Sequence, residues 1–180
     1  MKKCLWFLLL ITTACTPGMQ GSGSDGRQSV NYSIALPDQW VEVTSSRHFL
    51  MTKDGVFSQY ILIQQRHVEE PFKHTKRTFN RQMLPQEAAQ VVLDEIASDR
   101  SVMNFKVIEN KPVQLNRYDG FRVVFTYKTS KGSEFKTTYY GFLKGDWFYS
   151  VRYNVSDRYD TREGYEDFEV VLDSFRIKGA

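Results

Sequence analysis

Hydrophobic and polar residues alternate at the start of the region that we expect to fold. Val30, Tyr32, Ile34 and Leu36 are separated by smaller or polar residues up to Pro37. This period of two predicts a strand. Two further strands are expected over residues 49–51 and 59–68, because they flank Lys53-Asp54-Gly55, a turn signal that joins them in a hairpin.

The spacing of apolar residues becomes helical in two places. From Pro85, a residue that suits the first position of a helix, Leu84, Ala88, Val91 or Val92, and Ile96 recur at helical spacing. Near the C-terminus, Asp160 and Glu163 have the spacing of a capping box. They precede an apolar stripe made of Tyr165, Phe168, Val171, Leu172 and Phe175. Both segments predict amphipathic helices that pack one face on a sheet.

Four more strands are expected between these helices, over residues 105–115, 121–128, 134–143 and 147–155. Tyr118-Asp119-Gly120 and Lys144-Gly145-Asp146 are turn signals that join them into two hairpins. Most apolar bulk falls on alternate positions, which we assign to one side of each strand: Phe121, Val123, Phe125 and Tyr127, then Phe135, Thr137, Tyr139 and Leu143, then Trp147, Tyr149, Val151, Tyr153 and Val155. The predicted fold class is α+β, an antiparallel sheet of about six to seven strands flanked by helices, in a single domain over residues 30–180.

Four sequence landmarks resemble the PsbP-like family, which includes DcrB-type envelope lipoproteins. They are LPDQW at 36–40, DGF at 119–121, GDWFYSVRY at 145–153 and FEVVLDSFRI at 168–177. The resemblance covers nearly all of residues 30–177 and implies an αβα sandwich. It further implies a noncatalytic binding or assembly protein, and it supplies no catalytic positions to transfer.

The N-terminus has the pattern of a signal peptide. Lys2 and Lys3 precede the apolar run 4–11, which is too short to span a bilayer, and small residues lead to Cys15. The segment TTAC resembles the lipobox of bacterial lipoproteins, although Thr12 stands where that family usually has Leu. The expected organisation is a signal peptide over 1–14, followed over 15–29 by an acylated Cys15, a palmitate site, and a flexible tether rich in Gly and Ser.

Acylated Cys15 is thus expected to anchor the protein in a lipid bilayer of the bacterial cell envelope. Thr16 is not the Asp that often signals inner-membrane retention among lipoproteins, so the resemblance implies the outer membrane, facing the periplasm. The alternative is ordinary secretion with Cys15 as a bystander.

Composition narrows the function further. The chain has 180 residues, of which 41% are hydrophobic, and this is typical of one globular domain. Its net charge of +3 falls to +1 once Lys2 and Lys3 are removed, so charge gives no case for nucleic acid as a partner. The only cysteines are Cys4 and Cys15, which excludes cysteine catalysis, thiolate metal sites and disulfides in the folded domain.

Candidate chemistry is sparse. His67, Glu70 and His74 would share one face of a helix as metal ligands, but Pro71 interrupts them, so no metal site is expected. The acidic series Asp157, Asp160, Glu163, Glu166 and Asp167 lacks the pattern of a calcium loop and suits a helix N-terminus. No catalytic motif or cofactor signature occurs, and a Ser-His-Asp triad would be recognised only by geometry. We therefore expect a protein that is not an enzyme.

An asymmetry of charge gives the most usable functional hint. Residues 66–81 carry a net +3, whereas residues 157–173 carry a net −5. Two interpretations of the basic segment stay open. It is either an edge that contacts anionic lipid headgroups or an acidic partner, or one of two solvated faces of the domain that attract each other. Its basic residues are Arg66, Lys73, Lys76, Arg77 and Arg81.

The leading hypothesis is a membrane-anchored, noncatalytic module that binds an envelope protein partner. Tyr140, Phe142 and Phe148 are assigned to the face opposite the main apolar set, and they join the candidate interaction surface if no second helix covers them. A second hypothesis is a carrier of a small hydrophobic ligand or lipid between sheet and helix, which requires a large apolar cavity. A hydrolase is the third. The sequence does not assign an oligomeric state.

Overall fold

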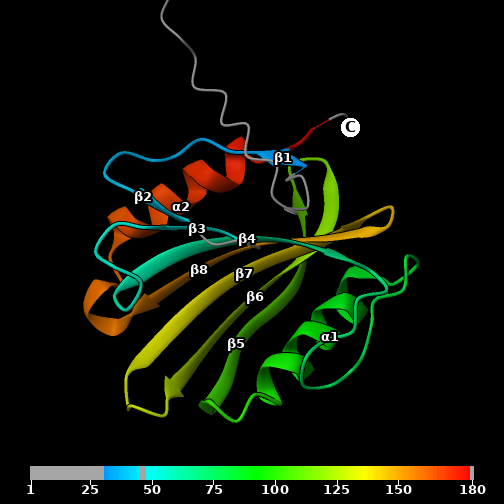
Figure 1. Ribbon diagram of the computed structural model, residues 1–180, viewed down its shortest axis with the longest axis horizontal. Coiled ribbons are helices and arrows are strands. Elements are labelled where there is room, and N and C mark those ends of the chain that lie inside the picture. Colours follow the sequence, from blue (N-terminus) through cyan, green and yellow to red (C-terminus); the bar gives the residue numbers. More distant parts are fainter. Residues whose placement is uncertain (1–30, 45–47, 179–180) are drawn as a thin grey trace, which may run out of the picture.

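The computed structural model describes residues 31–44 and 48–178 (Figure 1). The predicted signal peptide over 1–14, Cys15 and the tether up to residue 29 lie outside the described residues. Within the part that is described, no helix is long and apolar enough to cross a membrane.

Seven antiparallel strands form the main sheet, in the order β2-β3-β4-β8-β7-β6-β5. Their bounds are Val41–Thr44 (β2), Phe49–Thr52 (β3), Gln59–His67 (β4), Val102–Leu115 (β5), Tyr118–Thr129 (β6), Glu134–Lys144 (β7) and Trp147–Ser156 (β8). The three expected hairpins are present as β3-β4, β5-β6 and β7-β8. The α+β class and the size of the sheet are confirmed.

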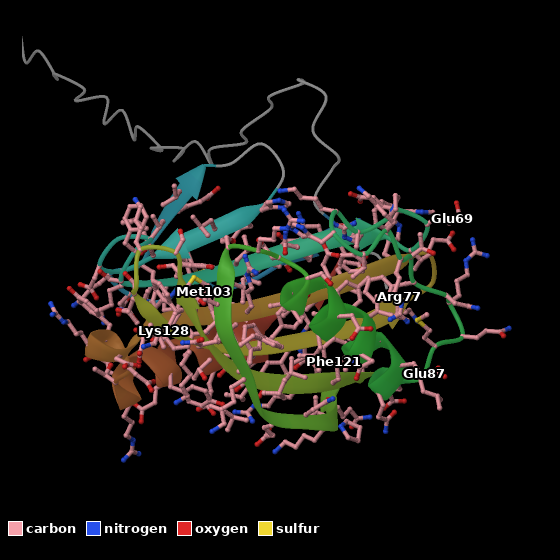
Figure 2. The ribbon with its side chains drawn as sticks, turned by 90° about the horizontal axis from the view of Figure 1, so that it is seen from below. Glu69, Arg77, Glu87, Met103, Phe121 and Lys128 are labelled. Atoms are coloured by element: carbon pink, nitrogen blue, oxygen red, sulfur yellow. The ribbon has the colours of Figure 1, made fainter. Side chains whose placement is uncertain are left out.

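Two helices cover opposite faces of this sheet, which gives three layers (Figure 1). Helix α1 (Pro85–Ala97) buries Ala88, Ala89, Val91, Val92 and Leu93 against one face, and helix α2 (Arg162–Ser174) buries Phe168, Val171 and Leu172 against the other. Figure 2, turned toward the α1 side, shows Phe121 between the sheet and α1. Both predicted amphipathic helices therefore pack as expected.

The assignment of the strand faces was wrong for β8. The set Tyr149, Val151, Tyr153 and Val155 faces α2, whereas the apolar sets of β6 and β7 face α1. The register explains the difference, because β7 and β8 pair Phe142 with Tyr149 and Leu143 with Phe148. With a helix on each face, alternate positions of a central strand are both buried, and apolar bulk does not mark a single core face.

The expected aromatic surface is consequently not formed. Phe142 is 1% exposed beneath α2, and Phe148 is 3% exposed in the core on the α1 side. Tyr140 is half-buried, with its ring 6.0 Å from that of Phe168 on α2. The prediction held only if no second helix covered these residues, and the structure has a helix on each face of the sheet.

Several element boundaries also differ from the prediction. Strand β6 begins at Tyr118, so the expected turn residues 118–120 lie within the strand, and Asn116 and Arg117 make the turn. Helix α2 is capped by Thr161, whose Oγ1 accepts a hydrogen bond from the Gly164 amide at 3.2 Å, and not by Asp160. The Asp160 carboxylate instead pairs with Lys136 Nζ at 2.9 Å. A 3₁₀ turn over Asp157–Tyr159 leads into this cap.

The first strand is shorter than expected. It spans only Tyr32–Ser33 (β1) and pairs with Arg176–Ile177 (β9) in a separate two-stranded sheet. Strands β2 and β9 were not predicted, since four- and two-residue segments carry too little periodicity to be recognised.

Candidate functional site

A pocket of about 550 Å³ lies between the sheet and the C-terminal part of α1. Its wall combines three sources: the sheet strands, the end of α1 with the start of β5, and the loop that follows β4. The principal lining residues are Tyr60, Gln64, Arg66, Phe72, Lys73, His74, Val92, Glu95, Ile96, Asp99, Ser101, Val102, Phe125, Tyr127, Thr137, Tyr139, Arg152 and Asn154. Its volume is that of a site for a small molecule. We call it the α1-side pocket.

Two polar residues of β8, Arg152 and Asn154, form the floor of this pocket. Ser150, Arg152 and Asn154 occupy alternate positions on the face that turns toward α1, and Ser150 and Asn154 are each 2% exposed. Asn154 Oδ1 accepts hydrogen bonds from Thr137 Oγ1 at 2.6 Å and from Tyr127 Oη at 3.2 Å. The amide oxygen of Asn154 is therefore satisfied within the protein.

Arg152 differs from Asn154 in this respect. Its Nε is buried and has no hydrogen-bond partner among the described residues. Its guanidinium carbon lies 5.8 Å from the centre of the Tyr60 ring, a cation–π distance. Within residues 31–44 and 48–178, no carboxylate forms an ion pair with Arg152. Burying a charged donor without a partner is costly, and such a group calls for a physical explanation.

Arg66 provides a second guanidinium at the pocket. It forms an ion pair with Glu70 at 3.4 Å and donates to the carbonyls of Glu70 and Pro71 at 3.4 and 3.3 Å. Its guanidinium carbon lies 4.5 Å from the centre of the Phe72 ring. These contacts hold Arg66 in place from the loop side.

The two acidic residues of the pocket are occupied by local hydrogen bonds. Glu95 accepts from the backbone amides of His74 and Thr75, each at 2.9 Å, and from Thr75 Oγ1 at 3.0 Å. Burial alone would raise the pKa of Glu95, but these donors outweigh it and hold the pKa below its usual value. Glu95 thus fixes the loop that closes one side of the pocket.

Asp99 is occupied in the same way. It accepts from the Ser101 amide at 2.9 Å and from Ser101 Oγ at 2.7 Å, and these two bonds are the main cause of its lowered pKa. His74 Nε2 lies 3.6 Å from the other oxygen of Asp99. Because the Ser101 hydroxyl donates to Asp99 and not to His74, the three residues lack the nucleophile-to-base order of a hydrolytic triad.

Two buried tyrosines complete the pocket chemistry. Burial, with a further contribution from Tyr60, raises the pKa of Tyr127 to about 12, against the opposing charge of Arg152. Burial likewise raises the pKa of Tyr139, against a Ser150 hydrogen bond and the charges of Arg152 and Arg66. Both phenols are neutral near pH 7, so they contribute aromatic walls without negative charge beside the cations of the pocket.

The predicted basic residues are only partly brought together. Arg66 and Lys73 line the α1-side pocket, and Lys76 is exposed on the same loop. Arg77 pairs with Asp94 beside α1 (Figure 2), and Arg81 Nε lies 2.5 Å from Asp146. Three of the five cations, Arg66, Arg77 and Arg81, are therefore paired with nearby acidic residues.

The acidic series behaves similarly. Glu163 and Asp167 pair with Lys53 at 2.6 and 3.4 Å, and Glu166 pairs with Arg162 at 2.8 Å. None of the ion pairs among the described residues joins the acidic series to the basic loop, so the two segments do not hold each other.

The histidines of the 67–70–74 spacing point to different neighbours. The His67 ring meets Trp147 edge-on at 5.3 Å, whereas His74 faces Asp99. The part of the chain that the structure describes contains no group of three or more potential metal-ligating residues.

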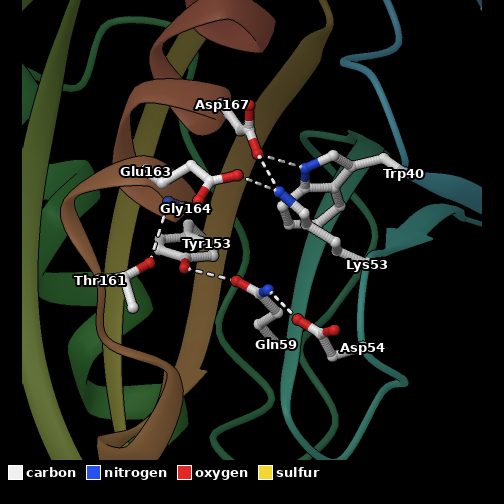
Figure 3. Close-up of polar contacts among 9 residues, drawn as sticks. All are labelled: Trp40, Lys53, Asp54, Gln59, Tyr153, Thr161, Glu163, Gly164 and Asp167. Atoms are coloured by element: carbon white, nitrogen blue, oxygen red, sulfur yellow. Dashed lines mark hydrogen bonds and ion pairs between the residues drawn. The ribbon is translucent and has the colours of Figure 1, made fainter.

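A second polar cluster lies on the opposite face of the sheet and seats α2 (Figure 3). Trp40 Nε1 donates to Asp167 at 2.8 Å, and Asp167 shares Lys53 with Glu163. Beside it, Tyr153 Oη donates to Gln59 Oε1 at 2.8 Å, and Gln59 Nε2 donates to Asp54 at 2.6 Å. Each of these groups has a partner within the cluster, which marks it as a structural element that ties the 36–40 landmark to α2.

Sequence reasoning missed the floor of the α1-side pocket. The strand over 147–155 was described by its apolar set alone, and the alternate polar positions Arg152 and Asn154 were not considered as site residues. The usable signal was the run Ser150, Arg152 and Asn154 on a strand that lies in the middle of the sheet, where both faces are covered.

Comparison with solved structures identifies the fold. No protein-family model and no curated protein matches the sequence. LpqN of Mycobacterium tuberculosis, described as involved in cell envelope biogenesis, is similar at 10% identity over 82% of this chain and 83% of that chain, with a TM-score of 0.56. The Ran-binding protein Mog1p of Saccharomyces cerevisiae is similar at 8% identity over 82% and 90%, with a TM-score of 0.54.

The cyanobacterial PsbP (CyanoP) of Synechocystis is similar at 12% identity over 82% of this chain and 86% of that chain, with a TM-score of 0.51. The chain spans only 45% of a Bacteroides thetaiotaomicron protein that also shares the fold, at 12% identity over 82% of this chain, with a TM-score of 0.51. At these identities the likeness concerns the fold alone. The chain has the PsbP/Mog1-like α+β fold that its sequence landmarks implied.

Proposed function

We propose that this protein is a noncatalytic binding module of a bacterial cell envelope, and that its α1-side pocket holds a small ligand. The observation that carries the proposal is the 550 Å³ pocket itself, which is built over a buried polar strand face and contains an unpartnered Arg152 Nε. A concave site with aromatic walls and a few convergent polar groups is the usual form of a small-molecule site.

A binding role fits the state of the pocket's titratable groups better than a catalytic one. The carboxylates of Glu95 and Asp99 are engaged by local donors, and Ser101 is directed at Asp99. Tyr127 and Tyr139 are held neutral by burial. The groups that remain are donors and cations, which orient a ligand without transforming it.

The envelope location rests on two supports. The first is the lipobox-like segment that ends at Cys15, which favours an acylated anchor at that residue. The fold is shared with LpqN, which is described as involved in cell envelope biogenesis. We further propose that the protein lies in the outer membrane and faces the periplasm, because Thr16 is not the Asp that often signals inner-membrane retention among lipoproteins.

An envelope protein partner also stays a prediction. Because Phe142 and Phe148 are buried, the candidate surface for this partner on the chain is limited to the basic loop and the half-buried Tyr140. The hydrophobic carrier required a large apolar cavity, whereas the pocket wall mixes aromatic residues with Arg66, Arg152 and Asn154. A small ligand with a polar group suits this wall better than a bare hydrocarbon.

Ligand retention tests the proposed site. The full-length chain, purified without denaturation from its own cells, should carry a small molecule that native mass spectrometry detects at about one equivalent. Ile96→Trp, which fills the pocket from α1, should abolish that species. Val170→Trp, at a residue that is 49% exposed on α2, is the matched control and should retain it. Loss from both variants, or no bound molecule in the unaltered chain, would contradict the proposal.

The anchor has its own test. Cys15→Ser should move the protein from the membrane fraction to the soluble fraction and abolish labelling with a palmitate analogue. Cys4→Ser is the control, since Cys4 lies in the segment expected to be removed. Equal membrane association of both variants would refute acylation at Cys15.

A further inference from the structure

If the α1-side pocket holds a ligand, as proposed above, its charged groups define the polar end of that ligand. Arg66, Lys73 and Arg152 bring three cations to the wall, whereas Glu95 and Asp99 bring two carboxylates. The carboxylates already accept hydrogen bonds from His74, Thr75 and Ser101. Arg66 is paired with Glu70, so Arg152 is the guanidinium whose charge the described residues do not neutralise.

The chemistry of a guanidinium then specifies what completes it. Arginine presents N–H donors in a rigid fork and accepts nothing, so its natural complement is a planar or tetrahedral oxyanion. A carboxylate or phosphate beside Arg152 would supply both the missing negative charge and acceptors for its donors.

The remainder of the wall specifies the body of the ligand. Five aromatic residues line the pocket, namely Tyr60, Phe72, Phe125, Tyr127 and Tyr139, together with the aliphatic Val92, Ile96 and Val102. Tyr60 and Phe72 already face the two guanidiniums, at 5.8 and 4.5 Å from ring centre to guanidinium carbon. Flat surfaces lined by rings favour a flat apolar body, which gains from offset stacking.

We propose that the α1-side pocket binds a small molecule that carries an oxyanion, a carboxylate or a phosphate, beside a flat aromatic body, and that Arg152 binds the oxyanion. Arg66 and Lys73 contribute long-range attraction from the pocket wall. Nothing in this arrangement requires a chemical change in the ligand.

Two fluorescent probes test the charge requirement directly. 1-Anilinonaphthalene-8-sulfonate carries an oxyanion on a flat body, and N-phenyl-1-naphthylamine has the same rings without the charge. The full-length chain should bind the sulfonate at one site, and more tightly than the neutral probe. Arg152→Met should weaken sulfonate binding about tenfold or more and leave the neutral probe unchanged, because only the charge-assisted bonds are lost. Arg77→Met, outside the pocket, is the control and should change neither.

The outcomes separate this ligand class from the proposed function. Equal binding of both probes, each insensitive to Arg152→Met but blocked by Ile96→Trp, would overturn the oxyanion and leave a ligand pocket. Binding of neither probe would overturn both.

Competition against the bound sulfonate then distinguishes the two oxyanions. Displacement by 1-naphthoate identifies a carboxylate, and displacement by 1-naphthyl phosphate identifies a phosphate. Displacement by neither would overturn the proposal.

Discussion

Replacing Arg152 with methionine should make the unliganded protein more stable, which is an unusual expectation for a residue on a central strand. Leaving the buried Nε donor unsatisfied costs about 1–3 kcal/mol in the folded state. The cation over the Tyr60 ring returns about 0.5–1 kcal/mol of this. Methionine keeps an apolar stem of similar length and adds no buried donor. The net gain in the free energy of unfolding should therefore be about 1 kcal/mol.

Urea denaturation followed by tryptophan fluorescence measures this change, and a thermal melt should show a rise of about 2–4 °C. Arg66→Met is the matched control in the same pocket. It should lower the stability by about 1 kcal/mol, because Arg66 has a Glu70 ion pair and a Phe72 ring to lose. A loss of more than about 1 kcal/mol for Arg152→Met would refute the reasoning, since it would mean that Arg152 has a stabilising partner in the folded chain.

Two further predictions concern the supports of the fold and of the pocket loop. Gly164→Ala should destabilise the protein by about 1–3 kcal/mol in urea denaturation, because its new Cβ would meet Tyr153 Oη and overpack the core, despite the better helix propensity of alanine. The cost should shrink in the Tyr153→Phe background, and an equal cost in both backgrounds would contradict the clash. Glu95 has a lowered pKa, so its contribution to stability is present above about pH 4.5 and is lost as pH falls through its folded-state pKa. Glu95→Gln should flatten that part of the acid-unfolding curve, and an unchanged curve would show that the hydrogen bonds to His74 and Thr75 do not stabilise the loop.

Much of the fold could be predicted from local patterns. The turn signals at Gly55 and Gly145 placed two hairpins correctly, because both glycines adopt the positive φ that such turns require. The third hairpin was also expected, but its turn lies at Asn116 and Arg117, where Asn116 has a positive φ, and Gly120 lies within β6. Helix α1 begins at Pro85 as expected, and the Glu87 carboxylate accepts from the Leu84 amide at 2.8 Å to close its first turn. These features depend on residues close together in the sequence.

The pocket could not be predicted in the same way, because it depends on which face of each strand is covered. Ser150, Arg152 and Asn154 look like solvated positions until their face of the sheet is known to be the one that carries α1. Which residues of β8 share that face follows from its pairing with β4 and β7, and such long-range register is not written in a local period. The same ambiguity led Phe142 and Phe148 to be placed on one surface, although they lie on opposite faces.

The Arg152 Nε–H resonance offers the most direct test of the binding site. It can be followed by ¹H–¹⁵N NMR in the full-length chain and assigned by its absence in Arg152→Met. Titration with 1-naphthoate should move this proton downfield as the carboxylate accepts from it, while the Arg77 resonance stays in place. An Arg152 resonance that does not respond at saturating 1-naphthoate and 1-naphthyl phosphate would contradict the account, because the buried Nε donor, which has no partner among the described residues, would then have no oxyanion to meet.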